Sequence, residues 1–351
     1  MPKLYTNLIS QARDHIISQQ WADGSFASMS IPVSDQAPTK TDMQTVFFSS
    51  LIADALSLNL DDIRISNVRE LIINFLLTQK SDQWSFNYWV RLSPQARALP
   101  YPDDLDDTFC SLAAISNIAP HLLTPEVMAS VMGLLIAAEQ APGGPYRTWL
   151  TNQSEGVWQD VDVAVNANIA YFCRLQGVTL PPLVTYLRST VENKTLNSPY
   201  YPNILPVLYY LARAFENCPD QKTIELIISL LQEQKKSTVL DHGLATAALL
   251  RLGMAPESVT DSLNWIDGRV ASEGFPPDPF CFDPSDRGVK YAAGCSSFTA
   301  AVCLEAVLRF GQAASVIKTS TSHQIARMPQ TEGVYQVVVD QVLATCHQYP
   351  K

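Results

Sequence analysis

The chain has 351 residues, of which 47% are hydrophobic and 17% are charged, so it can bury a large core and is not intrinsically disordered. Lys and Arg number 24 against 34 Asp and Glu, and the net charge of −10 argues against a broad nucleic-acid-binding surface. No basic N-terminal region precedes an apolar segment and no apolar run reaches about 18 residues, so we expect a cytoplasmic protein without a membrane span.

Apolar residues recur with the period of an α-helix along most of the chain, and no alternating pattern predicts a strand. Helices with one apolar face are expected at 4–19, 62–79, 125–140, 182–193, 223–235, 258–272 and 333–347. Helices apolar on all sides are expected at 43–58 and from about 104, 160, 201, 241 and 291. Because all-apolar helices belong inside a fold and one-faced helices outside, this alternation predicts an all-α (α/α)6 barrel. Residues 1–351 would form this toroid as a single domain.

Three of the one-faced helices end at a glutamine. Gln20, Gln79 and Gln140 are 59 and 61 residues apart, as in a repeat array. The turn at 20–26 (Gln-Trp-Ala-Asp-Gly-Ser-Phe) resembles the QW repeat of the terpenoid cyclase and protein prenyltransferase toroids. The later copies depart from it, since Gln83 replaces the glycine and the third turn has no tryptophan. The resemblance implies a toroid fold but no particular chemistry.

Four carboxylates crowd residues 103–107, immediately before an apolar run, and helix capping explains too few of them. Crowding favours protonation, and a protonated carboxyl against an apolar wall is a candidate Brønsted acid. The stretch 104–108 (Asp-Leu-Asp-Asp-Thr) resembles the D-x-D-D-T motif of class II terpene cyclases, the family of squalene-hopene and diterpene cyclases. The resemblance implies that Asp106 is the general acid that protonates an isoprenoid alkene, with Asp104 and Asp107 as its supporting neighbours.

Inner helices of such a toroid point the same way, so their N-terminal ends meet at one mouth. Asp162 and Asn166 are four residues apart on one inner helix and would face the same way, so they are candidates for binding the acid or the substrate. Arg147 lies in a turn beside Tyr146 and Trp149, and it is the first candidate for binding a diphosphate. These five residues are therefore expected to bind substrate.

Tyr201 and Phe48 are aromatic residues of inner helices that are expected to line a cavity and stabilise a carbocation through their ring faces. With the family resemblance, the sequence predicts a class II, protonation-initiated terpene cyclase that acts on a linear isoprenoid, with a prenyl diphosphate as first choice. No cofactor is expected, apart from Mg²⁺ carried by a diphosphate. Either the loops at 26–40, 84–103 and 274–290 close the cavity, or a second subunit, as in a homodimer, does.

Other classes of function stay open. Glycan hydrolases and lyases also use (α/α)6 barrels with paired carboxylates, and Asp106 and Asp162 could form such a pair. A non-catalytic toroid that binds a lipid or a partner is the third class, but it leaves the crowded carboxylates without a purpose. A zinc site like that of protein prenyltransferases is not expected, because no segment resembles their ligand motif.

Overall fold

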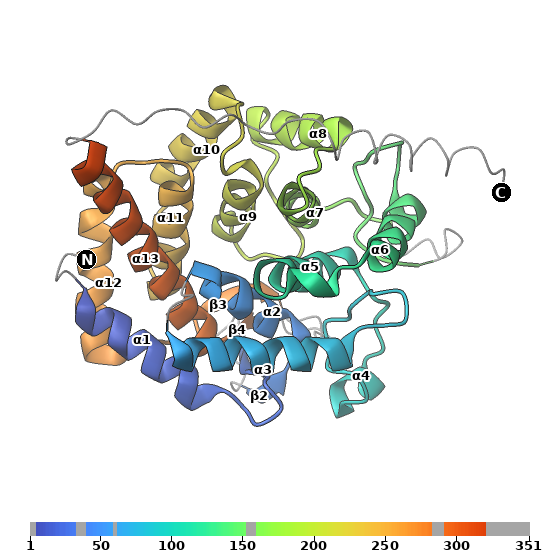
Figure 1. Ribbon diagram of the computed structural model, residues 1–351, viewed down its shortest axis with the longest axis horizontal. Coiled ribbons are helices and arrows are strands. Elements are labelled where there is room, and N and C mark those ends of the chain that lie inside the picture. Colours follow the sequence, from blue (N-terminus) through green and yellow to red (C-terminus); the bar gives the residue numbers. More distant parts are fainter. Residues whose placement is uncertain (1–4, 33–39, 59–61, 152–158, 283–290, 321–351) are drawn as a thin grey trace.

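The computed structural model describes residues 5–32, 40–58, 62–151, 159–282 and 291–320, and the expected helix at 333–347 lies outside them. Within these residues the chain forms an (α/α)6 toroid, a ring of inner helices surrounded by outer helices (Figure 1). The inner helices are α2 (Val46–Ala55), α5 (Leu105–Ile118), α7 (Val163–Leu175), α9 (Leu205–Phe215), α11 (Val239–Arg251) and α13 (Ser296–Ser320). The outer helices are α1 (Thr6–Gln19), α3 (Ile63–Gln79), α6 (Pro125–Ala138), α8 (Pro181–Glu192), α10 (Gln221–Glu233) and α12 (Thr260–Glu273).

Side-chain patterning explains which helices lie inside. All 10 residues of α2 are buried, whereas the outer helix α8 buries a single stripe of its surface. A helix that is apolar on all sides must be surrounded by protein, and a helix with one apolar stripe covers the outside. Each inner helix packs on the next one along the chain, and α13 packs on α2, which closes the ring. The all-α toroid predicted from the alternation of helix types is therefore the fold of the chain.

The prediction that the chain has no strands is wrong. Four short strands form an antiparallel sheet in the order β2-β1-β4-β3, and they are β1 (Ala27–Pro32), β2 (Lys40–Gln44), β3 (Pro279–Phe282) and β4 (Tyr291–Gly294). β4 and the last two residues of β2 occupy positions where the sequence predicts the first turns of two inner helices. Strands of four to six residues are too short for an alternating pattern to stand out, and Met29 pairs with Gly294, which is remote in sequence.

The turn after α1 ties this helix to α3. The side-chain amide of Gln20 donates hydrogen bonds to the carbonyl oxygens of Gly24 (3.1 Å) and Val68 (3.0 Å). Gly24 has a φ of +93°, and a Cβ atom there would lie 2.1 Å from the carbonyl oxygen of Leu71. Only glycine fits so close to α3 in this conformation. The motif at 20–26 thus holds two outer helices together, which is a structural role.

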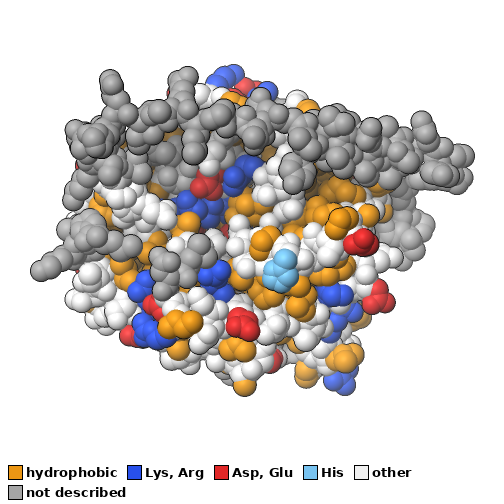
Figure 2. Space-filling view, in the orientation of Figure 1, with side chains coloured by type: hydrophobic (Ala, Val, Ile, Leu, Met, Phe, Trp, Pro, Cys, Tyr) orange, Lys and Arg blue, Asp and Glu red, His pale blue; other side chains and the backbone are white. Residues whose placement is uncertain are grey.

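Buried charges occupy the end of the barrel where α9 and α11 finish. Arg251 forms ion pairs with Glu216 (2.8 Å) and Glu305 (2.5 Å), and Arg309 binds the same two carboxylates. Cationic side chains are stabilised here by the negative ends of the helix dipoles. Figure 2 shows Lys or Arg and Asp or Glu side chains together in the hollow between α9 and α11. The cavity described below lies at the opposite end, where the inner helices begin.

Candidate active site

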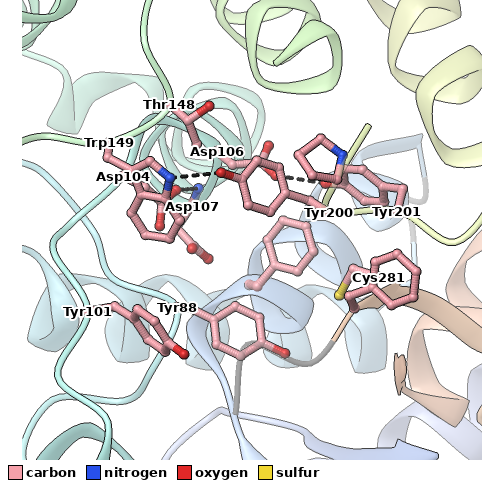
Figure 3. A pocket seen from close by; sticks show the side chains of 13 residues that line it. Tyr88, Tyr101, Asp104, Asp106, Asp107, Thr148, Trp149, Tyr200, Tyr201 and Cys281 are labelled. Atoms are coloured by element: carbon pink, nitrogen blue, oxygen red, sulfur yellow. Dashed lines mark hydrogen bonds between the residues drawn. The ribbon is translucent and has the colours of Figure 1, made fainter. Parts of the chain in front are cut away.

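A cavity of about 310 Å³ opens at the N-terminal ends of the inner helices (Figure 3). Its wall comes from the first turns of α2 and α5, from the segments that precede α7 and α9, and from β3. Seven aromatic residues and three aspartates line it, together with Thr148, Pro199 and Cys281. The volume is at the lower end of the range for small-molecule sites. The cavity is therefore mostly aromatic and carries its carboxyl groups on one side.

Asp106 presents its carboxyl group to this cavity from the first turn of α5. Its Oδ1 atom accepts a hydrogen bond from the side-chain amide of Asn168 (2.7 Å), and its Oδ2 atom accepts one from the hydroxyl of Tyr201 (2.7 Å). Burial raises the pKa of Asp106 above its ordinary value, while the two hydrogen bonds and the charge of Arg213 act in the opposite direction. The carboxyl group thus retains its proton more readily than a free aspartate, and its anion is still stabilised.

The carboxyl groups of Asp104 and Asp107 form a pair beside that of Asp106. Asp104 caps α5, and its Oδ1 atom accepts a hydrogen bond from the backbone N–H of Asp107 (2.8 Å). The two carboxyl groups are buried next to each other, and their mutual repulsion favours a proton on one of them. Burial raises the pKa of Asp104 to about 7, and burial with the neighbouring charge of Asp104 raises that of Asp107 well above its ordinary value. The pair therefore holds a proton at neutral pH.

The aromatic wall near the cavity opening is held by a carboxylate that does not itself line the cavity. Asp160 Oδ2 accepts hydrogen bonds from the hydroxyls of Thr148 (2.8 Å) and Tyr200 (2.7 Å). The indole N–H of Trp149 donates to the Tyr200 hydroxyl (2.8 Å), and the two rings meet edge to face at 6.0 Å. These bonds fix the orientation of both rings. Figure 3 shows Tyr88 and Tyr101 across the cavity from the aspartates.

An aromatic cluster joins the cavity wall to the barrel core, with Phe280 of β3 at its centre. The ring of Phe280 is fully buried and lies with its centroid 4.7–6.2 Å from those of Phe47, Phe48, Tyr201, Tyr210 and Phe298. Phe47 and Tyr201 line the cavity, whereas Phe280 and the other three rings do not. Phe280 therefore packs against two rings of the cavity wall without reaching the cavity itself.

The structure brings five of the site residues expected from sequence to one cavity. Asp104, Asp106, Asp107, Trp149 and Tyr201 all line it. Tyr201 does so from the turn before α9, because this helix begins at Leu205 and not at Tyr201 as the sequence predicts.

Five other expected substrate-binding residues do not line the cavity. Asp162 caps α7, and its Oδ1 atom accepts from the backbone N–H groups at 164 and 165, while burial raises its pKa to about 6. The side-chain amide of Asn166 pairs with both the N–H and the C=O of Tyr146 (2.9 Å each), which anchors the turn on α7. Arg147 donates to the carbonyl oxygen of residue 137 (2.6 Å) and to Gln159.

Phe48 is the fifth residue outside the cavity wall, and it packs in the aromatic cluster while its neighbour Phe47 reaches the cavity. Asn168 is the residue that the sequence does not single out. Two residues further along α7 than Asn166, it points to the other side of the helix, where it reaches Asp106. A fully buried amide in an apolar helix is the available signal, but the sequence does not say which of the two amides faces the acid.

Within the described residues, no group of three or more His, Cys, Asp and Glu side chains is arranged to hold a metal ion. In that same part of the chain, no helix combines the length and the apolar character needed to cross a bilayer. Both oxygens of Asp106 accept their hydrogen bonds from protein side chains, Asn168 and Tyr201.

Tyr201→Phe should lower the maximal rate of any reaction that starts with a proton from Asp106 by about tenfold or more, because a hydrogen bond to a charged group contributes about 1.5–3 kcal/mol. A general acid works in its protonated form, so activity falls as the pH rises through its pKa. Losing the hydroxyl raises the pKa of Asp106 and should move this fall to higher pH. The measurement is the pH–rate profile. Tyr5→Phe, which removes a hydroxyl bound to Asn264, is the control, and identical profiles in wild type and Tyr201→Phe would contradict the argument.

Scans of protein-family models and of curated proteins find no match to this chain. Solved structures do match it. A variant of the type II terpene cyclase MstE from Scytonema, in complex with geranylgeranyl dihydroxybenzoate, has a TM-score of 0.62 and 12% identity, and the alignment covers 88% of this chain and 97% of that chain. A protein from Actinoplanes has a TM-score of 0.64 at 12% identity, over 87% of this chain and 99% of that chain.

An unsaturated glucuronyl hydrolase specific for heparin has a TM-score of 0.54 at 11% identity, over 89% of this chain and 98% of that chain. At these identities the likeness concerns the fold alone. Because the alignment includes nearly all of the MstE chain, the common unit is the whole toroid and not a part of it. The chain has the (α/α)6 toroid fold of the type II terpene cyclases, a fold that it also shares with a glucuronyl hydrolase.

Proposed function

We propose that the protein is a class II terpene cyclase in which Asp106 protonates the terminal alkene of a linear isoprenoid. One observation carries the proposal: the carboxyl group of Asp106 lies in an aromatic cavity, and both of its oxygens accept hydrogen bonds from buried donors. Protonating an alkene requires an acid that is neutral before the step and a stable anion after it. Burial favours the neutral acid, and the hydrogen bonds from Asn168 and Tyr201 stabilise the anion.

In the first step the O–H bond of Asp106 breaks, and the π electrons of the terminal alkene form a new C–H bond. The tertiary carbocation that results is attacked by the next alkene along the chain, which closes a ring and moves the positive charge onward. Ring faces stabilise such a charge by about 0.5–2 kcal/mol each. Phe47, Tyr101 and Trp149 supply such faces in the cavity wall. Loss of a proton from the last cation to a base or to water ends the reaction.

The substrate class in this proposal is a linear isoprenoid, with a prenyl diphosphate as the first choice. The chemistry at Asp106 needs only the alkene farthest from the headgroup, so the diphosphate would stay intact and lie away from the acid. Among the described residues that line the cavity, none is Lys or Arg. Arg147 is engaged elsewhere, so an uncharged or aryl headgroup belongs in the same test.

Glycan hydrolysis is the less favoured function on this geometry. Glycosidases commonly place two carboxylates on opposite sides of the scissile bond, about 5–9.5 Å apart. All the described carboxylates that line the cavity come from one turn, at Asp104, Asp106 and Asp107, and Asp162 is used as a helix cap. The opposite side of the cavity carries Tyr88 and Tyr101. This arrangement suits one proton donor facing an apolar substrate.

The test is incubation of the purified protein with farnesyl and geranylgeranyl diphosphate, geranylgeranyl dihydroxybenzoate and squalene, each with and without Mg²⁺. Products are extracted, after phosphatase treatment where needed, and analysed by chromatography with mass spectrometry. A product with the mass of its substrate (or of the dephosphorylated alcohol) and fewer double bonds would support protonation-initiated cyclisation. Absence of any such product from the whole panel, together with cleavage of an unsaturated glucuronide, would overturn the proposal in favour of the hydrolase.

Phe280→Ala should shift substrate preference towards longer isoprenoids, because it removes the ring that packs against the cavity-lining rings of Phe47 and Tyr201 and so leaves space into which the cavity can extend. Each methylene accommodated in an apolar site changes kcat/KM by about 10–200-fold, so the geranylgeranyl to farnesyl ratio should rise at least tenfold. Phe298→Ala is the matched control: it removes an equally buried ring of the same cluster, one that packs against Phe48 and Phe280, neither of which lines the cavity. An equal shift in both variants would show that general loosening, and not cavity depth, sets the preference.

A further inference from the structure

A second cavity, which shares no lining residue with the first, lies on the outside of the barrel. It has a volume of about 450 Å³ and lies between α3 and the turn that follows α5, where the short 3-10 helix η2 (Pro120–Leu122) begins. α3 contributes one stripe of side chains, at positions three, four and seven residues apart: Ser66, Arg69, Glu70, Ile73, Asn74 and Leu77. The opposite wall is residues 118–122.

Arg69 is the unusual member of this outer cavity. Its side chain lines the cavity, only 8% of the residue is exposed, and it makes no hydrogen bond or ion pair with the part of the chain that the structure describes. Its Nε atom is fully buried without a partner. An arginine carries five N–H donors and keeps its charge at any physiological pH. The Nε atom is buried, the two terminal nitrogens are not, and no described group pairs with the charge, so this guanidinium is suited to receive an anion at the cavity.

The neighbouring groups do not supply that anion. Glu70 is the next residue along α3, and adjacent residues of a helix point in directions about 100° apart, so the two do not face each other. The side chain of Glu70 is exposed, and no described cation pairs with it. The C-terminal end of α5 at Ile118 brings a negative dipole end, but a dipole end leaves the hydrogen-bond donors of Arg69 unused.

The wall of the outer cavity also has an apolar part. Ile73 and Leu77 follow Arg69 along α3, and Ile118 and Leu122 face them. At a rise of about 1.5 Å per residue, the distance along the helix from Arg69 to Leu77 is about 12 Å. A ligand with an anionic head at Arg69 and a short apolar tail along this wall would satisfy both parts.

We propose that the outer cavity binds an amphiphilic anion, with its carboxylate or phosphate on the guanidinium of Arg69 and its apolar chain against Ile73, Leu77 and Leu122. The planar guanidinium matches both kinds of oxyanion with two parallel hydrogen bonds. A fatty acid supplies the carboxylate, and a short prenyl or alkyl phosphate supplies the phosphate. The site does not depend on the cyclase chemistry, since none of its residues lines the first cavity.

The test is isothermal titration calorimetry with four probes: octanoate, octyl phosphate, octanol and inorganic phosphate. Either amphiphile should bind with a dissociation constant below about 1 mM, and octanol and inorganic phosphate should bind at least tenfold more weakly. The stronger of the two amphiphiles identifies the headgroup. Saturable binding that is equal for octanol and octanoate would show that Arg69 takes no part and would overturn the proposal.

Three variants separate this site from the first cavity and from a purely structural role of Arg69. Arg69→Gln should weaken amphiphile binding at least tenfold, while Arg64→Gln, an exposed arginine of the same helix, should leave it unchanged. Leu77→Gln should weaken the amphiphiles but not inorganic phosphate. The ligand-free melting temperature of Arg69→Gln should equal or exceed that of wild type. A lower melting temperature, with unchanged amphiphile binding, would mean that Arg69 serves only the end of α5.

Discussion

Asp106→Asn should abolish cyclisation and leave the fold intact. A positioned general acid contributes about 10²–10⁴-fold to a rate, and the amide of asparagine is not acidic, so the loss should be at least a hundredfold. The amide has the size of the carboxylic acid and retains an oxygen that Asn168 or Tyr201 can bind. The measurement is product formation per unit time by mass spectrometry, with residual activity above a tenth of wild type contradicting the role.

The effect of Asp106→Asn on the melting temperature follows from the pKa of Asp106. Burial raises the pKa of Asp106, so the folded protein binds this proton more tightly than the unfolded chain does. Stability contributed by the protonated form is therefore lost as the pH rises from the unfolded towards the folded pKa. Asparagine resembles the protonated form at every pH, so the melting temperature at pH 7 should equal or exceed that of wild type. Asp220→Asn is the control for activity, since it changes the cap of an outer helix and asparagine also caps well.

Asp54→Ala should have the largest effect on stability, with a loss of about 3–5 kcal/mol in the free energy of unfolding, because removing one partner of a buried ion pair leaves an uncompensated charge. Asp54 and Arg213 lie 3.3 Å apart, with 1% of each side chain exposed. Within the described residues, the three guanidinium nitrogens of Arg213 make no hydrogen bond, and the guanidinium also lies over the rings of Tyr171 (4.1 Å), Tyr210 (5.4 Å) and Tyr209 (5.8 Å). Urea denaturation measures the change.

The matched control for this second prediction is an exposed ion pair. Glu273 and Arg269 approach to 2.8 Å on α12, with 48% and 50% of their side chains exposed. Such pairs contribute about 0.3–0.5 kcal/mol, so Glu273→Ala should change stability very little. The double variant Asp54→Leu with Arg213→Met should recover most of the loss, because neither charge of this pair is then left buried without its partner. Equal effects of Asp54→Ala and Glu273→Ala would mean that Arg213 is hydrated in solution.

The sequence predicts the toroid because the residues of each inner helix are apolar on all sides of the helix. It also points to the three aspartates that line one cavity, since crowded carboxylates at a helix start and the D-x-D-D-T resemblance coincide at Asp104, Asp106 and Asp107. Both signals come from residues that are neighbours in the sequence, so they can be recognised without the structure.

The remaining site residues depend on angles and contacts that a linear pattern does not contain. Asn166 and Asn168 have the same chemistry in the same helix, and only the rotation of α7 about its axis sends the second one to Asp106. The sequence suggests that Arg147 is free to bind substrate, but its guanidinium donates a hydrogen bond to a carbonyl oxygen at the end of α6. The sheet depends on pairing between segments at opposite ends of the described chain, which no window of sequence contains.

This last pairing has a consequence for the order in which the protein can mature during synthesis. The acid-bearing turn leaves the ribosome after about a third of the chain, but β3, which supplies Cys281 and Phe280, and α13, which closes the ring on α2, are made some 170 residues later. Contacts between distant segments form slowly and leave apolar surface exposed in the meantime. A nascent chain therefore carries a complete acid motif without a cavity around it. The ring closes on α2 only after α13 has been released, so until then the helices are a set of hairpins without an enclosed cavity.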